Sequence, residues 1–288
     1  MKLVNIAFAS ITFLGLAAVG CSSSDDDASN TGDLATNESQ LVTDDSDAAN
    51  IDDDLESAVD EPLSGATTTN PGAPAEGKTA AEIIAIVKEN AAKFFLPAGC
   101  LTSTQTGDSI THVFKECTGP YGLKTFTGTI SSEYSVAGDG KITVKHAANG
   151  FTANGASISG ERVVTYTQAG SVWTKTRDGQ WTGKTPAGKD VSHDASFVTT
   201  YDSSTKCLTR DGSAQSTVGG RSFERTVDGY KRCGIGRFGC PESGELTLSA
   251  TKSAETLTVK VTFEGGTKYS VTRPNGRVVQ RRLVCSAS

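Results

Sequence analysis

Short runs of β-branched and polar residues fill the chain from Cys100 to its end, separated by Gly, Asn and Asp. The runs follow one another too closely for crossover helices, so the pattern predicts a mainly β fold with an antiparallel meander sheet, as a sandwich or a barrel-like form. Abundant Thr and Ser suit a sheet with one solvated face. The expected strands are 111–116, 124–136, 141–146, 156–167, 172–177, 180–184, 195–201, 206–209, 222–227, 245–251, 256–263, 267–273 and 277–284.

Two dipeptides predict tight hairpin turns, because Asp-Gly and Asn-Gly tolerate positive φ at both central positions. They lie in Arg177-Asp-Gly-Gln180 and in Pro274-Asn-Gly-Arg277. Trp173 and Trp181 flank the first turn. They could stack on sugar rings, although cross-strand packing in the core is the commoner use of tryptophan.

One amphipathic helix precedes the sheet. Thr79-Ala-Ala-Glu82 has the form of a capping box, and apolar residues recur behind it at helical spacing up to Phe95. Pro97 ends the pattern. We expect this helix to pack on the sheet, with insertion into a membrane surface as the alternative.

The N-terminus has the pattern of an export signal over residues 1–20, with Lys2 followed by an apolar run that is too short to span a bilayer. It ends in Ala18-Val-Gly-Cys21, which resembles the lipobox of bacterial lipoproteins. The resemblance implies that Cys21 is acylated and becomes the mature N-terminus, and Ser22 after it implies the outer membrane. The alternative is an ordinary signal peptide in which Cys21 is incidental.

Residues 21–78 differ sharply in composition from the rest of the chain. Fifteen Asp and Glu stand against one Lys, with no aromatic residue. Such a segment buries too little apolar surface to offset its ordering entropy, so we expect a disordered, lipidated acidic tether. Its Asp clusters lack the alternating ligands and the central Gly of an EF-hand loop, which argues against a calcium site.

Residues 79–288, the expected β domain, are net basic, because the tether holds fifteen of the 33 acids of the chain and only one of its 27 bases. This balance favours anionic neighbours such as lipopolysaccharide, surface polysaccharide, nucleic acid or the protein's own tether. The alternative is a set of solvated surface charges. The candidate anion-binding residues are Lys231, Arg232 and Arg237 near a glycine-rich loop, and Arg273, Arg277, Arg281 and Arg282 on the final hairpin.

The glycine-rich loop Cys233-Gly-Ile-Gly-Arg-Phe-Gly-Cys240 spells the dinucleotide fingerprint. That fingerprint indicates dinucleotide binding only between a strand and a helix of a βαβ unit. Here the motif lies between two cysteines and Pro241 follows Cys240 directly. The glycines are more simply the flexible residues of a loop bounded by cysteines.

Six cysteines in an exported domain predict three disulfides. We expect Cys100 to pair with Cys117 and the other four to join the C-terminal half. Zinc is the competing interpretation, but the cysteine spacings are not those of zinc sites and no histidine lies near a cysteine pair, so no metal is expected. The six residues are Cys100, Cys117, Cys207, Cys233, Cys240 and Cys285.

No catalytic or cofactor motif is present in the sequence. His193 and Asp194 are adjacent in an expected strand and therefore point to opposite faces. Cys117-Thr-Gly-Pro-Tyr-Gly122 and Arg232-Cys233 with Cys240-Pro-Glu-Ser-Gly244 are similar to uncharacterised bacterial lipoproteins, a resemblance that implies no activity.

We therefore expect a non-enzymatic, lipid-anchored envelope or surface protein without a cofactor, which binds an anionic glycan, lipid or protein. Nucleic acid is not expected for an exported chain. The alternative is a periplasmic hydrolase acting on envelope carbohydrate, since paired carboxylates are defined by spatial rather than sequential spacing. Two convergent carboxylates in a cleft would favour the enzyme.

Overall fold

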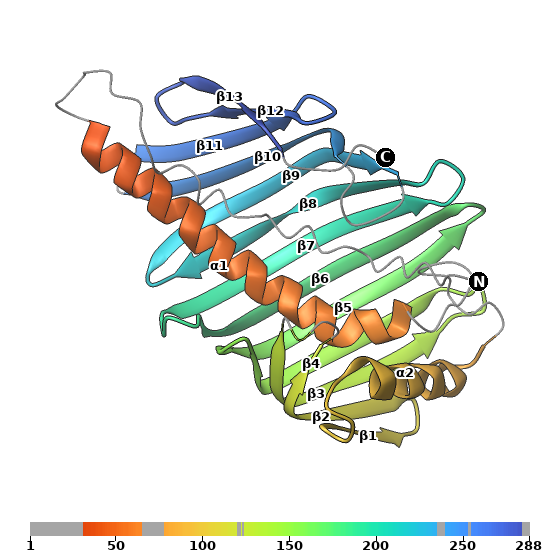
Figure 1. Cartoon of the computed structure of the whole chain (residues 1–288). Helices are drawn as coiled ribbons and strands as arrows, with labels where there is room; N and C mark the ends of the chain where they lie inside the picture. The colour runs from red at the N-terminus through yellow and green to blue at the C-terminus, as the bar shows by residue number, and fades with distance from the viewer. Residues whose placement is uncertain are drawn as a thin grey trace.

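A single antiparallel sheet of 13 strands dominates the computed structural model, and its strands lie in the order of the sequence (Figure 1). The structure describes residues 31–64, 78–119, 122, 124–234, 240–252 and 255–283. The strands are β1 (Leu101–Thr106), β2 (Ser109–Thr118), β3 (Thr125–Val136), β4 (Ile142–Ala153), β5 (Ala156–Ala169), β6 (Val172–Lys184), β7 (Asp190–Asp202), β8 (Cys207–Val218), β9 (Arg221–Cys233), β10 (Pro241–Lys252), β11 (Glu255–Phe263), β12 (Lys268–Thr272) and β13 (Val278–Arg282).

The mainly β meander predicted from the sequence is confirmed, as one continuous sheet. A hairpin at Pro274–Arg277 is also confirmed, since this segment connects β12 to β13. Only one of its two central residues has the expected positive φ: Gly276 has φ of 77°, whereas Asn275 does not have positive φ. The predicted turn at Asp178-Gly179 is wrong, because β6 runs through it without a break. Gly179 pairs there with Arg162 of β5, and a Cβ on Gly179 would lie 2.9 Å from Arg162 Cγ. The glycine makes room for a side chain rather than for a turn.

The predicted amphipathic helix is α2 (Ala80–Phe94). Its capping box forms as expected: Thr79 Oγ1 accepts from the Glu82 amide, and the Glu82 carboxylate accepts from the Thr79 amide at 2.7 Å. Ile83, Ile84 and Val87 bury their side chains in one core cluster with residues of the first strands. The helix therefore packs on the sheet, near β1 to β4 (Figure 1).

A second helix, α1 (Thr31–Ser64), lies diagonally across one face of the sheet (Figure 1). The prediction of a disordered tether is therefore wrong for residues 31–64. The physical reason is that Leu41, Ile51, Leu55 and Val59 bury at helical spacing while neighbouring acids pair with bases of the sheet. Residues 1–30 and 65–77, including Cys21, lie outside the described residues.

Two disulfides join neighbouring strands or their flanks. Cys100 pairs with Cys117 as predicted, and Cys207 pairs with Cys233 across β8 and β9. Cys240 is also disulfide-bonded, and Cys285 lies outside the described residues, so the third predicted disulfide stays a prediction. Disulfides persist in oxidising compartments, which indicates an extracytoplasmic environment. Neither described helix has the length and apolar character needed to cross a bilayer.

Candidate functional site

The face of the sheet covered by α1, here called the inner face, carries a group of cations that are all buried except the half-buried Arg210. Arg162 lies on β5, Lys175 and Arg177 on β6, Arg210 on β8 and Arg225 on β9. Side chains alternate between the two faces of a strand, so residues an even number of positions apart point to the same face. These cations lie an even number of positions from buried apolar residues of their own strands and therefore point to the inner face. The sheet therefore presents a set of bases to the face that α1 covers.

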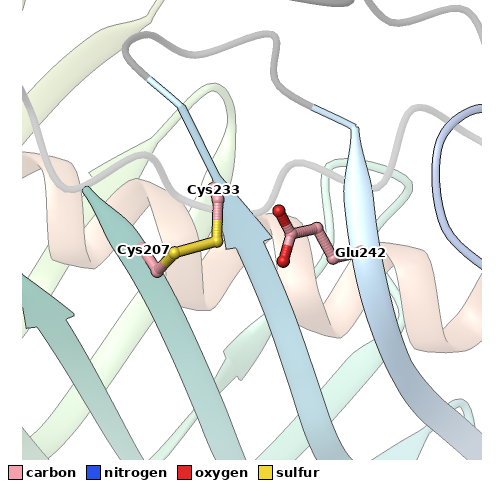
Figure 2. A group of neighbouring side chains, drawn as sticks. All are labelled: Cys207, Cys233 and Glu242. Carbon is pink, nitrogen blue, oxygen red and sulfur yellow. A yellow bond between two sulfur atoms is a disulfide. The ribbon is translucent and has the colours of Figure 1, made fainter. Parts of the chain in front are cut away.

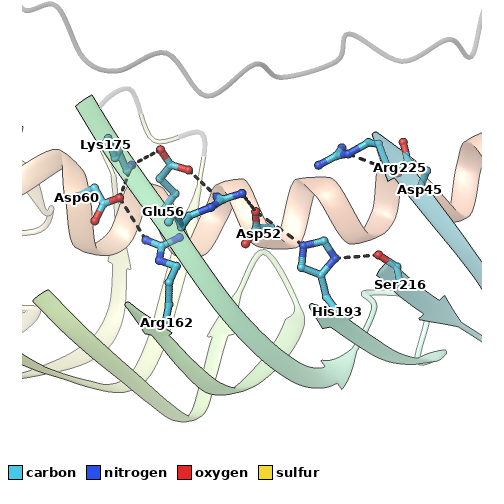
Figure 3. Close-up of polar contacts among 10 residues, drawn as sticks. Asp45, Asp52, Glu56, Asp60, Arg162, Lys175, His193, Ser216 and Arg225 are labelled. Atoms are coloured by element: carbon cyan, nitrogen blue, oxygen red, sulfur yellow. Dashed lines mark hydrogen bonds and ion pairs between the residues drawn. The ribbon is translucent and has the colours of Figure 1, made fainter. Parts of the chain in front are cut away.

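Carboxylates spaced four residues apart on α1 meet these cations (Figure 3). Asp60 Oδ2 lies 2.6 Å from Lys175 Nζ and 3.2 Å from Arg162 Nη2. Glu56 lies 2.6 Å from Lys175 Nζ and, through its other oxygen, 2.8 Å from Arg177 Nη1. Residues four apart lie on one face of a helix, so a single stripe of α1 supplies these contacts.

Asp52 extends the same stripe by one more turn. Its Oδ2 lies 2.7 Å from Arg177 Nη2 and 3.9 Å from His193 Nε2. Nδ1 of His193 lies 2.8 Å from Ser216 Oγ, so the imidazole is hydrogen-bonded to the neighbouring strand and lies next to Asp52 (Figure 3). A buried charge is costly unless an opposite charge compensates its lost hydration. Asp52, Glu56 and Asp60 each have such a partner among Arg162, Lys175 and Arg177.

Further pairs continue along α1 on both sides of this centre. Each joins a carboxylate of the helix to a base of the sheet or its loops. They are Asp54 with Lys124 at 2.9 Å, Asp44 with Lys189 at 3.0 Å and with Arg221 at 3.5 Å, Asp45 with Arg225 at 3.9 Å, and Glu38 with Arg273 at 3.8 Å. The acidic helix and the basic inner face are thus complementary over most of the length of α1.

The pKa values at this interface follow burial and these pairings. Burial alone would raise the pKa of Asp60, but Lys175 and Arg162 outweigh it and hold that pKa well below its usual range. Arg177 does the same for Asp52. Asp53 differs, because burial dominates and raises its pKa to about 7. The interface thus holds fully ionised carboxylates beside one that titrates near neutrality.

All three histidines of the chain lie on the buried side of the sheet, each with its Nδ1 2.8 Å from a serine hydroxyl. The pairs are Ser103 with His112, Ser132 with His146, and Ser216 with His193. Burial lowers the pKa of His112 and of His193 to about 4, so both are neutral at physiological pH. As expected from the sequence, the Asp194 side chain lies on the opposite, exposed face from His193. These histidines are structural members of the core.

The structure splits the candidate anion-binding residues predicted from the sequence. Lys231 and Arg232 end β9 at the same end of the sheet as Arg281 and Arg282 of β13. Arg273 and Arg277 instead flank the β12–β13 turn at the opposite end. Lys231 pairs with Glu242 at 3.0 Å, Arg273 lies near Glu38, and Arg237 lies outside the described residues.

Cys207, Cys233 and Glu242 form a group with metal-ligand chemistry in the described part of the chain (Figure 2). Zinc binds cysteine as the thiolate, but these two sulfur atoms are bonded to each other. Glu242 already faces Lys231. The group is therefore a disulfide beside an ion pair, and it offers no metal site.

Sequence reasoning missed the inner-face cations, although a signal for them exists. Lys175 and Arg177 share strand parity with Trp173, which places two cations on the same face as an aromatic core residue. On α1, the matching signal is the four-residue spacing of Asp52, Glu56 and Asp60 beside an apolar stripe. Each pattern becomes meaningful only when the two segments are considered together.

The fold and this site define an antiparallel meander sheet whose basic inner face binds an acidic helix of the same chain. A scan against protein-family models finds no match, and searches of curated proteins and of solved structures find none either.

Proposed function

We propose that this chain is a non-enzymatic envelope protein, anchored at the bacterial outer membrane through acylated Cys21, which binds an anionic glycan, lipid or protein. The lipobox-like sequence and the disulfides support export and anchoring. The observation that carries the binding proposal is a set of exposed cations along the β12–β13 hairpin, here called the basic edge. It consists of Lys268, Arg281 and Arg282 at one end of the hairpin and Arg277 beside the turn at the other.

The basic edge differs from the inner face in being free to act on other molecules. Of the inner-face cations, Arg162, Lys175, Arg177 and Arg225 pair with carboxylates of α1. The side chains of the basic edge are instead exposed and have no ion-pair partner among the described residues. An exposed group of one sign attracts anions and concentrates them at the surface. We therefore place the contact with the anionic partner at this edge of the sheet.

The alternative of a periplasmic carbohydrate hydrolase requires two carboxylates that converge on one glycosidic bond. Glu161, Asp194 and Glu224 line an open groove on the other face of the sheet, here called the outer face. They lie on β5, β7 and β9, with β6 and β8 between them, so they project side by side. This arrangement favours binding over catalysis.

The basic edge can be tested with vesicles containing phosphatidylglycerol and with polygalacturonate as defined anionic probes. We expect binding that weakens with salt and that falls at least ten-fold when Arg277, Arg281 and Arg282 are replaced together by Ala. The matched control replaces three exposed lysines that have no ion-pair partner within the described ranges, Lys88, Lys115 and Lys141. An equal loss in this control, or no binding to either probe, would contradict the assignment.

The anchor is tested separately by mass spectrometry of the mature N-terminus. A diacylglyceryl group on Cys21, and release of the Cys21→Ser variant from the membrane fraction, would support anchoring. An unmodified N-terminus would contradict the proposed lipid anchor and leave the binding proposal intact.

A further inference from the structure

An open groove of about 670 Å³ crosses the outer face of the sheet over β5 to β10. A twisted sheet is saddle-shaped, so each of its faces is hollowed along one diagonal. On the inner face α1 lies diagonally across the strands (Figure 1). On the outer face, all described residues that line the groove belong to strands β5 to β10. The groove is therefore a second concave surface, distinct from the basic inner face and from the basic edge.

Two rows of polar side chains line this groove, each with one residue from every strand of β5 to β9. Cross-strand pairing aligns the first row as alternating acids and amides: Glu161, Gln180, Asp194, Gln215 and Glu224. The second row consists of hydroxyls: Ser159, Thr182, Ser192, Thr217 and Ser222. Each strand thus presents one hydroxyl and one acid or amide to the groove, at a spacing of about 4.8 Å.

The central side chains of the first row are free to bind a ligand. Gln180, Asp194, Gln215 and Glu224 make no side-chain hydrogen bond or ion pair within the described part of the chain. Amides both donate and accept, while carboxylates accept only. Together they can pair with hydroxyl groups in either direction.

The charge of the groove indicates which ligands it suits. No lysine or arginine is among its described lining residues, and three carboxylates line it. It therefore disfavours the anions expected at the basic edge. A neutral chain of hydroxyl-bearing units, with a repeat close to the strand spacing, would present partners to each strand in turn.

We propose that this groove binds a linear neutral polysaccharide that runs across β5 to β10. Exposed polar contacts are individually weak, so affinity comes from repetition along the chain. The proposal does not depend on the anionic partner, because the two surfaces lie on different strands and have opposite charge.

Affinity electrophoresis of the full chain tests this site with three neutral polysaccharides: laminarin, glucomannan and dextran. We expect at least one of them to retard the protein. The double variant Gln180→Ala with Gln215→Ala should weaken that retardation at least ten-fold. The matched control is Gln105→Ala with Gln168→Ala, which removes two exposed glutamines outside the groove and should leave retardation unchanged.

Three outcomes would overturn the proposal: no retardation by any of the three polysaccharides, an equal loss in the control variant, or retardation by polygalacturonate alone. Circular dichroism of each variant excludes misfolding as the cause of a loss. Release of new reducing ends from a bound polysaccharide would contradict the non-enzymatic function, and its loss in the Gln180→Ala, Gln215→Ala variant but not in the control would still assign the groove as the binding site.

Discussion

Replacing Asp60 by Asn should destabilise the protein more than any surface charge substitution. The change keeps the size of the side chain but removes the carboxylate that pairs with Lys175 and Arg162. The Asp60 side chain is 6% exposed, and those of Lys175 and Arg162 are 5% and 3% exposed. Both cations would stay buried next to a neutral amide.

The magnitude follows from this burial. Breaking a buried ion pair by removing one partner costs about 3–5 kcal/mol, because the remaining charge is desolvated without compensation. Glu56 still pairs with Lys175, so we expect a loss near the lower end, about 3 kcal/mol at pH 7. Because the pKa of Asp60 lies below its usual range, this stabilisation is present above about pH 4 and is lost as the pH falls further.

Urea unfolding followed by tryptophan fluorescence measures the change, since Trp173 and Trp181 are both buried in the sheet. The matched control is Asp190→Asn, which breaks an exposed pair with Lys184 whose side chains are 85% and 57% exposed. That pair should contribute less than about 1 kcal/mol. If Asp60→Asn costs no more than the control, the buried ion-pair network does not hold α1 on the sheet.

Three further substitutions test other parts of the structure. Burial raises the pKa of Asp53 to about 7, so the folded state loses stability as the pH rises from about 4 to 7. Asp53→Asn should therefore be more stable than the parent at pH 8, and the difference should shrink as the pH falls and nearly vanish at about pH 4, by urea titration at each pH. Gly179→Ala brings a methyl group against Arg162 and should lower the free energy of unfolding by about 1–3 kcal/mol in the same assay. An unchanged free energy of unfolding would mean that β5 and β6 do not pair in this register. Replacing Cys100 and Cys117 together by Ser opens a disulfide that spans 17 residues and should cost about 3 kcal/mol, whereas an unchanged urea midpoint would count against the bond.

The sheet could be predicted from the sequence because its signals are local. Alternation and turn residues mark most strands, and the capping box at Thr79 marks the start of α2. Gly179 shows the limit of local reasoning, because Asp-Gly is typical of a turn and yet this glycine faces Arg162 on the neighbouring strand. Local sequence cannot distinguish a glycine that bends the chain from one that makes room.

The role of α1 required information from distant parts of the chain. Its many Asp residues are poor helix formers, and the acids that stabilise the helix repel one another until cations meet them. Most of those cations lie about 100 residues or more away, as with Asp60 and Arg162, whose separation is 102 residues. The net basic charge of the β domain predicts an anionic neighbour. The protein's own acidic segment is one of the candidates. Only the structure shows that this segment is a helix and which face it covers.

Hydrogen exchange of residues 41–60 in the intact protein tests the central claim most directly, namely that the acidic segment is a helix bound to the basic inner face. The account predicts slow exchange for these amides at pH 7, with protection close to that of β6, and faster exchange in the Asp60→Asn variant. Exchange of residues 41–60 at the rate of an unfolded chain, while β6 stays protected, would contradict it.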